Sequence, residues 1–250
     1  MRAFRWLFAL LIAAQVGYSF VPERRLTAAT RTIVGLMLAT SSAEAVAARG
    51  ARRGVAAVTG AGAVGFGVEL VGVATGRPFG HYVYSAKLGP RVGGVPLLAA
   101  AAWAMMARPA WVVAGLLDRR CAVRVPLAAG ALTAWDVFLD PRMVRDGYWT
   151  WPQGGRYEGV PASNFGGWLA TGLVLFTGLA ALERAPGSEP DRTDDGALAL
   201  YAWTWIGETV ANVAVWRRPR VAAAGTVAMG AFALPALRCR ARAPRRAGRR

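Results

Sequence analysis

The chain is built from long apolar blocks of roughly 17 to 25 residues, separated by short charged connections. In hydrocarbon, only a helix or a closed barrel satisfies its own backbone hydrogen bonds, and the blocks lack the alternation of barrel strands. We therefore predict an all-α, polytopic membrane helical bundle with about seven or eight spans, eight being the working number. The spans are expected at about residues 4–20, 32–48, 54–74, 92–117, 122–139, 166–183, 197–216 and 220–237.

Two of these spans need comment. The fourth contains Arg108-Pro109, where a proline could break the helix. The first follows Arg2 and Arg5 as a signal peptide would, but no small-x-small cleavage site follows it, so we expect a retained helix. The prediction is one transmembrane domain, residues 1–237, followed by a basic cytoplasmic tail, residues 238–250.

The net charge is +16, and all but one of the 30 basic residues are arginine. These residues lie in connections and in the tail beside apolar spans, a pattern that argues against nucleic acid as a partner. The tail alone holds seven arginines, which favours the cytoplasmic side of an inner (cytoplasmic) membrane. With an even number of spans, both termini lie on that side.

Two connections are unusually rich in aromatic residues and glycine. The first runs from Gly76 to Pro96, and the second from Asp140 to Trp168. Two spans separate them, so we predict that both loops lie on the same side of the membrane. The Trp and Tyr residues of the second loop are typical of an interfacial aromatic belt, but their mixture with glycines and Asn164 favours a folded lid.

Carboxyl groups inside apolar spans are costly to insert and so mark candidate functional sites. Asp136 and Asp140 are one helical turn apart and share a helix face. Their structural alternatives are a salt bridge to an arginine such as Arg142, or a helix end at Asp140-Pro141. We favour the functional interpretation, because two acids on one face can act together as proton donor and acceptor.

Three further acids occur in the apolar segments. Glu69 lies near the end of the third span, at the predicted depth of the aspartates. Glu208 could join them or hydrogen-bond a neighbouring helix, whereas Glu44 is expected toward the opposite end of the bundle in a structural role. His81 is the one histidine and the two cysteines are far apart in sequence, so we predict no metal site of the zinc type.

Several segments between about residues 65 and 170 resemble one known family. They read TGRPFGHYVYSAKLGP followed by GVP, then WDVFLDPRM, then GYWTWPQGGRYEGVPASNFGGW. Together, in this order, they resemble the membrane carotenoid biosynthesis protein family, whose characterised members are carotenoid 1,2-hydratases, including bisanhydrobacterioruberin hydratase. The resemblance implies addition of water to the terminal double bond of an acyclic carotenoid end group. It also implies partners, namely that carotenoid, membrane lipid and other carotenoid biosynthesis enzymes.

Such a reaction needs a positioned acid, a water, a base and little competing solvent, and we see no motif for a cofactor. We predict that Asp136 and Asp140 hold the general acid and base, with Glu69 as a third carboxylate. Aromatic faces could stabilise the carbocation. The predicted shell around the water and the end group is His81, Tyr82, Tyr84, Trp149, Trp151, Tyr157, Asn164 and Trp168.

Two alternatives remain open at this point. Asp136-x-x-x-Asp140 could hold magnesium in an intramembrane prenyltransferase, which would show magnesium dependence and release diphosphate. A transporter or a carotenoid-binding or lipid-binding scaffold could use the acids as a proton relay and would leave the mass of the pigment unchanged.

Overall fold

The computed structural model describes residues 1–183 and 194–242, and within them the chain forms eight α-helices and four very short strands. The helices are α1 (Arg2–Gly17), α2 (Leu26–Arg49), α3 (Ala51–Thr75), α4 (Leu97–Leu117), α5 (Cys121–Arg145), α6 (Ala162–Glu183), α7 (Asp195–Val210) and α8 (Pro219–Arg242). The strands are β1 (Val83–Tyr84), β2 (Arg91–Val92), β3 (Val95–Pro96) and β4 (Trp149–Thr150). The all-α prediction is confirmed.

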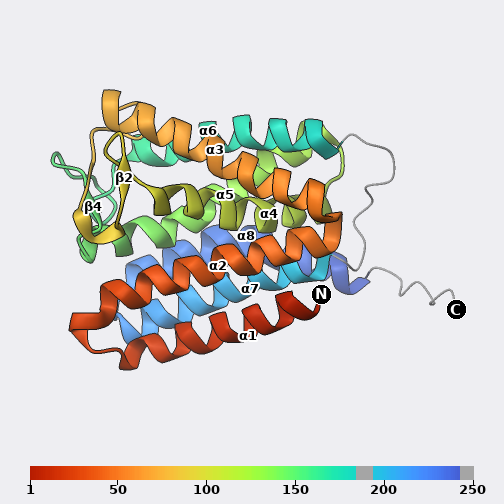
Figure 1. Cartoon of the computed structure of the whole chain (residues 1–250), viewed down its shortest axis with the longest axis horizontal. Helices are drawn as coiled ribbons and strands as arrows, with labels where there is room; N and C mark the ends of the chain where they lie inside the picture. The colour runs from red at the N-terminus through yellow and green to blue at the C-terminus, as the bar shows by residue number, and fades with distance from the viewer. Residues whose placement is uncertain (184–193, 243–250) are drawn as a thin grey trace, which may run out of the picture.

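The long helices run side by side as one bundle, with α4 in its interior (Figure 1). Helix α4 packs against α2, α3, α5, α7 and α8, and almost every residue from Trp103 to Gly115 is buried. A helix with neighbours on most sides must be apolar around most of its circumference, as the sequence of α4 is. The described ends of the chain, at α1 and α8, lie at the same end of the bundle.

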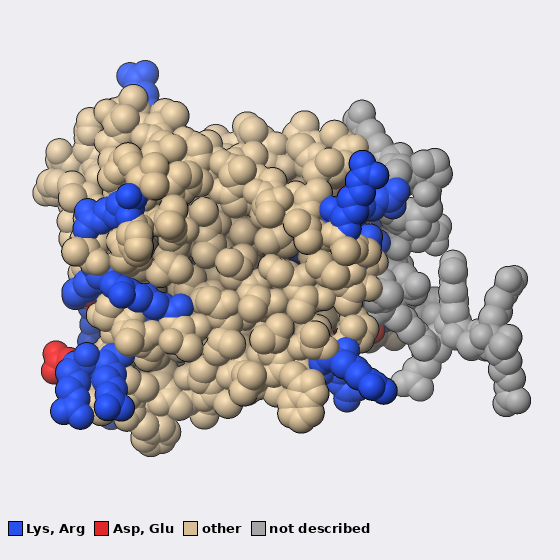
Figure 2. Space-filling model, viewed as in Figure 1, with Lys and Arg blue, Asp and Glu red and all other residues tan. Residues whose placement is uncertain are grey.

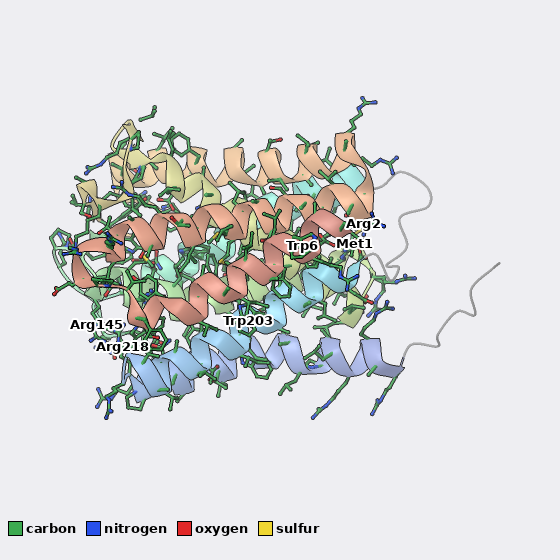
Figure 3. The ribbon with its side chains drawn as sticks, turned by 60° about the horizontal axis from the view of Figure 1, so that its bottom comes forward. Met1, Arg2, Trp6, Arg145, Trp203 and Arg218 are labelled. Carbon is green, nitrogen blue, oxygen red and sulfur yellow. The ribbon has the colours of Figure 1, made fainter. Side chains whose placement is uncertain are left out.

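Within the described residues, six helices are long and apolar enough to cross a membrane, namely α1, α3, α4, α5, α6 and α8. Helices α2 and α7 form where spans were predicted, but α2 carries Arg31 and Glu44, and α7 has 16 residues before a π-helical turn, Ala211–Val215. Basic side chains gather at the two ends of the molecule and leave its middle uncharged on the face in Figure 2. In Figure 3, Arg2 lies at one end, Arg145 and Arg218 at the other, and Trp203 between them. This is the surface of a multi-pass membrane protein.

Two predicted details of the fourth span were wrong. Helix α4 continues through Pro109 without a break, enclosed by its neighbours. It also begins later than predicted, because β2 and β3 form a hairpin instead of the first helical turn. The hairpin turn is Gly93-Gly94, where both residues have positive φ angles that glycine adopts without a steric penalty.

The two aromatic connections meet at one end of the bundle. Strands β1 and β4 pair antiparallel, with Val83 opposite Thr150 and Tyr84 opposite Trp149. The prediction that both loops lie on the same side is therefore confirmed. The second loop is shorter than predicted, because α5 continues to Arg145 and α6 begins at Ala162. The remaining connection is folded inward rather than spread as a belt, since Tyr148, Trp151 and Val160 are buried.

The opposite end of the bundle holds a buried network of ion pairs. Arg108 donates to Glu44 at 2.5 Å and to Asp194 at 2.7 Å, and Arg49 also donates to Asp194 at 3.2 Å. Glu44 therefore has the structural position that its sequence predicted. The predicted basic tail begins inside α8, which continues to Arg242, while residues 243–250 lie outside the described residues.

Candidate active site

The two aspartates of α5 are joined by one side chain of α6. The amide nitrogen of Asn164 donates to Oδ2 of Asp136 at 2.8 Å and also to Oδ2 of Asp140. All three side chains are buried, with Asp136 fully so. Because residues four apart lie one above the other on a helix, one amide can reach both carboxyl groups. The pair thus acts as a single unit held by Asn164.

The remaining oxygens of the two carboxyl groups, Oδ1 in each case, differ in their hydrogen-bond partners. Oδ1 of Asp140 accepts a hydrogen bond of 3.0 Å from the indole of Trp149, which lies in β4, in the connection between α5 and α6. Oδ1 of Asp136 is buried and has no hydrogen-bond partner among the described residues. Buried polar atoms are nearly always paired, and the carboxyl group of Asp140 is close enough to share a proton with that of Asp136.

Glu69 on α3 forms a second buried centre at the same end of the bundle. Its Oε2 accepts hydrogen bonds from the hydroxyls of Tyr82, at 2.5 Å, and Tyr84, at 2.8 Å. Its Oε1 accepts one from the indole of Trp103, at 3.2 Å. Burial, together with the negative charge of Glu69, raises the pKa of both tyrosines, so both remain protonated donors. All of these contacts hold the carboxylate in place.

Aromatic rings surround the region of the carboxyl groups. Trp103 stacks on Trp168 with 4.0 Å between ring centroids, and Trp135 meets Trp168 edge to face at 6.1 Å. Trp151 lies 5.8 Å from Tyr82 by ring centroids, and its indole donates to the carbonyl of Phe79 at 2.9 Å. The loops and α4 thus bring apolar, water-excluding faces to this end of the bundle.

Two of the predicted shell residues lie away from this buried cluster. His81 is exposed, with its ring against Gly76 at the end of α3. Tyr157 is half-buried and donates to the carbonyl of Val137 on α5, at 3.0 Å. Burial and the neighbouring Glu158 raise the pKa of Tyr157 to about 12, so it is a protonated donor as well. The other predicted residues, Tyr82, Tyr84, Trp149, Trp151, Asn164 and Trp168, all contact the cluster or its aromatic walls.

The structural alternatives for the aspartate pair were wrong. The guanidinium of Arg142 lies over the rings of Trp216, at 3.9 Å, and Tyr18, and its ion pair is with Asp146. Helix α5 continues through Pro141 to Arg145, so Asp140 does not end it. Glu208 does not hydrogen-bond the pair, and its Oε2 is buried without a hydrogen-bond partner in the described part of the chain.

The sequence interpretation missed Trp103 and Trp135. Each stands in an apolar span, where a tryptophan has many structural uses. A signal did exist for Trp103, because a buried indole N–H requires an acceptor, and Glu69 is a buried acid on a neighbouring helix. Within the described residues, no group of three or more His, Cys, Asp or Glu side chains is arranged to hold a metal ion.

The fold and this site define a multi-pass helical membrane protein with buried carboxyl groups beneath an aromatic cap formed by two loops. Residues 5–232 match the model of the family described as carotenoid biosynthesis protein, and the chain belongs to that family. It is 35% identical over 160 residues to a bisanhydrobacterioruberin hydratase of Haloarcula japonica, an overlap of 56% of this chain and 54% of the relative. The chain therefore spans about half the length of that curated relative. No solved structure matches the chain.

Proposed function

We propose that this chain is a carotenoid hydratase of an inner membrane. It adds water to the terminal carbon–carbon double bond of an acyclic carotenoid end group and needs no cofactor. The observation that carries the proposal is the buried Asp136–Asn164–Asp140 unit, in which Oδ1 of Asp136 has no partner among the described residues. The family to which the chain belongs and the hydratase activity named for its relative support carotenoid chemistry of this kind.

The chemistry begins with one proton shared by the two aspartates. Two ionised carboxyl groups bridged by one amide repel each other in a low-dielectric site, so one protonated and one ionised group is the favoured state. The unpartnered oxygen of Asp136 gives its proton to the less substituted alkene carbon. The tertiary carbocation that forms takes up a water, and the proton released from that water returns to the pair. The pair therefore ends with the one proton with which it started.

The surrounding residues suit a cation formed in a dry site. The faces of Trp103, Trp168 and Trp135 can stabilise positive charge through their π-electrons. Trp149 and Asn164 hold Asp140 as the ionised partner, whose charge also stabilises the cation. Glu69, with its three donors, is better suited to position the two loop tyrosines than to deliver a proton.

The test is expression of the chain in a bacterium that makes an acyclic carotenoid such as lycopene, followed by mass spectrometry of the pigments. We expect a product heavier by one water, which Asp136→Asn and Asp140→Asn both lose. Asp118→Asn is the matched control, because Asp118 is an acid at the other end of α4 that pairs with the exposed Arg120. An unchanged pigment mass with the protein present in the membrane would contradict the proposal, and a gain of prenyl units would favour a transferase.

A further inference from the structure

A cavity of about 430 Å³ lies between α2, α3, α4 and α6, at the end of the bundle opposite the aromatic loops. Its inner part is apolar and includes Ala45, Ala104, Ala107, Trp111 and Leu179. None of the aspartate pair, Asn164 or Glu69 lines it. The candidate active site therefore does not account for this cavity.

The mouth of the cavity is basic. Arg52 and Arg53 line it and are exposed, and Arg49 lies beside them. In the described part of the chain, neither Arg52 nor Arg53 makes a side-chain hydrogen bond or ion pair. Arg49, by contrast, is engaged in ion pairs with Glu183 at 3.6 Å and Asp194 at 3.2 Å. Figure 2 shows basic side chains gathered at this end, where α2 meets α3.

The position of Arg52 and Arg53 in the fold makes their charge unfavourable. Helix α3 begins at Ala51, so both arginines occupy its first turn. The first turn of a helix carries a partial positive charge and free N–H groups, which favour anions and disfavour cations. An anion bound at this mouth would relieve that repulsion and accept hydrogen bonds from both arginines.

Among the described residues, the acids near the cavity are already engaged in hydrogen bonds and ion pairs. Glu183 is the acid in the lining, and it accepts a hydrogen bond from Trp111 at 2.7 Å and pairs with Arg124 at 3.4 Å and Arg49 at 3.6 Å. Arg108, at the inner side, is paired with Glu44 and Asp194. The excess positive charge therefore remains at the exposed mouth rather than in the interior.

We propose that this cavity binds an anionic phospholipid, with the phosphate at Arg52 and Arg53 and part of an acyl chain among the alanines, Leu179 and Trp111. The charge of the mouth and the apolar character of the interior match the two halves of such a lipid. This end of the bundle also holds both described chain ends, and the arginine-rich tail that follows α8 favours the cytoplasmic surface, where anionic lipids are concentrated. A free inorganic anion would use the arginines but leave the apolar walls uncovered.

The test is thermal unfolding of the full chain in a nonionic detergent, with added phosphatidylglycerol or with phosphatidylcholine of the same acyl chains. We expect phosphatidylglycerol to raise the Tm more than phosphatidylcholine. The double variant Arg52→Gln/Arg53→Gln should lose this difference. The control, Arg2→Gln/Arg5→Gln, removes two exposed arginines from the same end of the molecule and should retain it.

Two further arms separate the lipid from simpler explanations. Ala57→Leu narrows the cavity without changing charge and should also lose the phosphatidylglycerol effect. Sodium phosphate at equal concentration should not reproduce that effect. If both arginine double variants lose the phosphatidylglycerol effect equally, the effect comes from surface charge and the proposal is overturned. Full stabilisation by phosphate alone would overturn it as well. The assay uses no carotenoid, so it stands apart from the test of hydration.

Discussion

Tyr84 and Trp149 face each other across the β1–β4 pair, and each holds a different buried carboxyl group. The Tyr84 hydroxyl donates to Glu69 at 2.8 Å, and the Trp149 indole donates to Asp140 at 3.0 Å, with 5.7 Å between the two ring centroids. One cross-strand pair therefore ties α3 to α5 through the two loops. The position of either loop depends on both carboxyl groups.

This linkage predicts coupling between Tyr84 and Trp149. Tyr84→Phe and Trp149→Phe each remove one hydrogen bond to a buried carboxyl group, which should cost about 1 to 3 kcal/mol of unfolding free energy. Because the two rings touch, the double variant should depart from additivity by at least about 0.5 kcal/mol. Denaturant unfolding in detergent measures the cycle, with Val83→Thr on the exposed face of β1 as the control. Strict additivity would show that the loops act independently.

The two aspartates should differ in activity while both variants fold. Asp136→Asn removes the proposed proton donor and should lower the rate of hydration by about 10² to 10⁴-fold. Asp140→Asn should lower it less, since Asp140 acts as the ionised partner. Asp136→Asn should not reduce thermal stability, because a neutral amide replaces a protonated acid of the same shape. Asp140→Asn should cost about 1 to 3 kcal/mol, because its single amide oxygen cannot accept from both Trp149 and Asn164. Initial rates in membranes with matched protein amounts test this, and a larger loss for Asp140→Asn would exchange the two roles.

Asn164 should matter for both stability and activity. Asn164→Ala removes the donor shared by Asp136 and Asp140 and leaves both carboxyl groups less satisfied, at a cost of about 1 to 3 kcal/mol. The rate of carotenoid hydration should also fall in this variant. Ser163→Ala, an exposed neighbour on the same turn of α6, should leave both quantities unchanged. Normal activity in Asn164→Ala would show that the hydrogen bonds from Asn164 to the two aspartates are not needed for hydration.

Gly65 is predicted to be sensitive to a single added methyl group. A Cβ at this position would collide with the ring of Trp103, which stacks on Trp168 and donates to Glu69. Gly65→Ala should therefore destabilise the protein by about 1 to 3 kcal/mol and shift tryptophan fluorescence. Gly67→Ala lies on the same helix in open space and should be neutral or slightly stabilising. Equal behaviour of the two variants would contradict this packing.

The ion pairs at the opposite end should affect stability alone. Arg108→Met leaves Glu44 without a partner and Asp194 with Arg49 alone, which should cost about 3 to 5 kcal/mol. Arg120→Met is the control, because Arg120 pairs with Asp118 at the surface, where solvent screens the ion pair and its contribution to stability is small. Activity per folded molecule should be unchanged in both. A selective loss of activity in Arg108→Met would connect this network to the site.

Local pattern alone determined the helical bundle, the placement of both aromatic loops on one side, and the shared face of Asp136 and Asp140. These features depend on the length of apolar runs and on the period of the helix, which neighbouring residues specify. The predicted start of α4 was wrong because the Gly93-Gly94 turn lies in an apolar run whose hydropathy is also that of a membrane-spanning helix. Its hairpin depends on backbone conformations that hydropathy does not reveal.

Tertiary structure alone decided which side chains meet. Asn164 contacts aspartates 24 and 28 residues away, and Trp103 contacts Glu69 across 34 residues. These pairs depend on how α3, α4, α5 and α6 are rotated against one another, and many rotations are compatible with the same hydropathy. Packing against Glu69 turns Tyr82 and Tyr84 inward. His81 therefore lies at the surface, because successive residues of an extended segment face opposite sides.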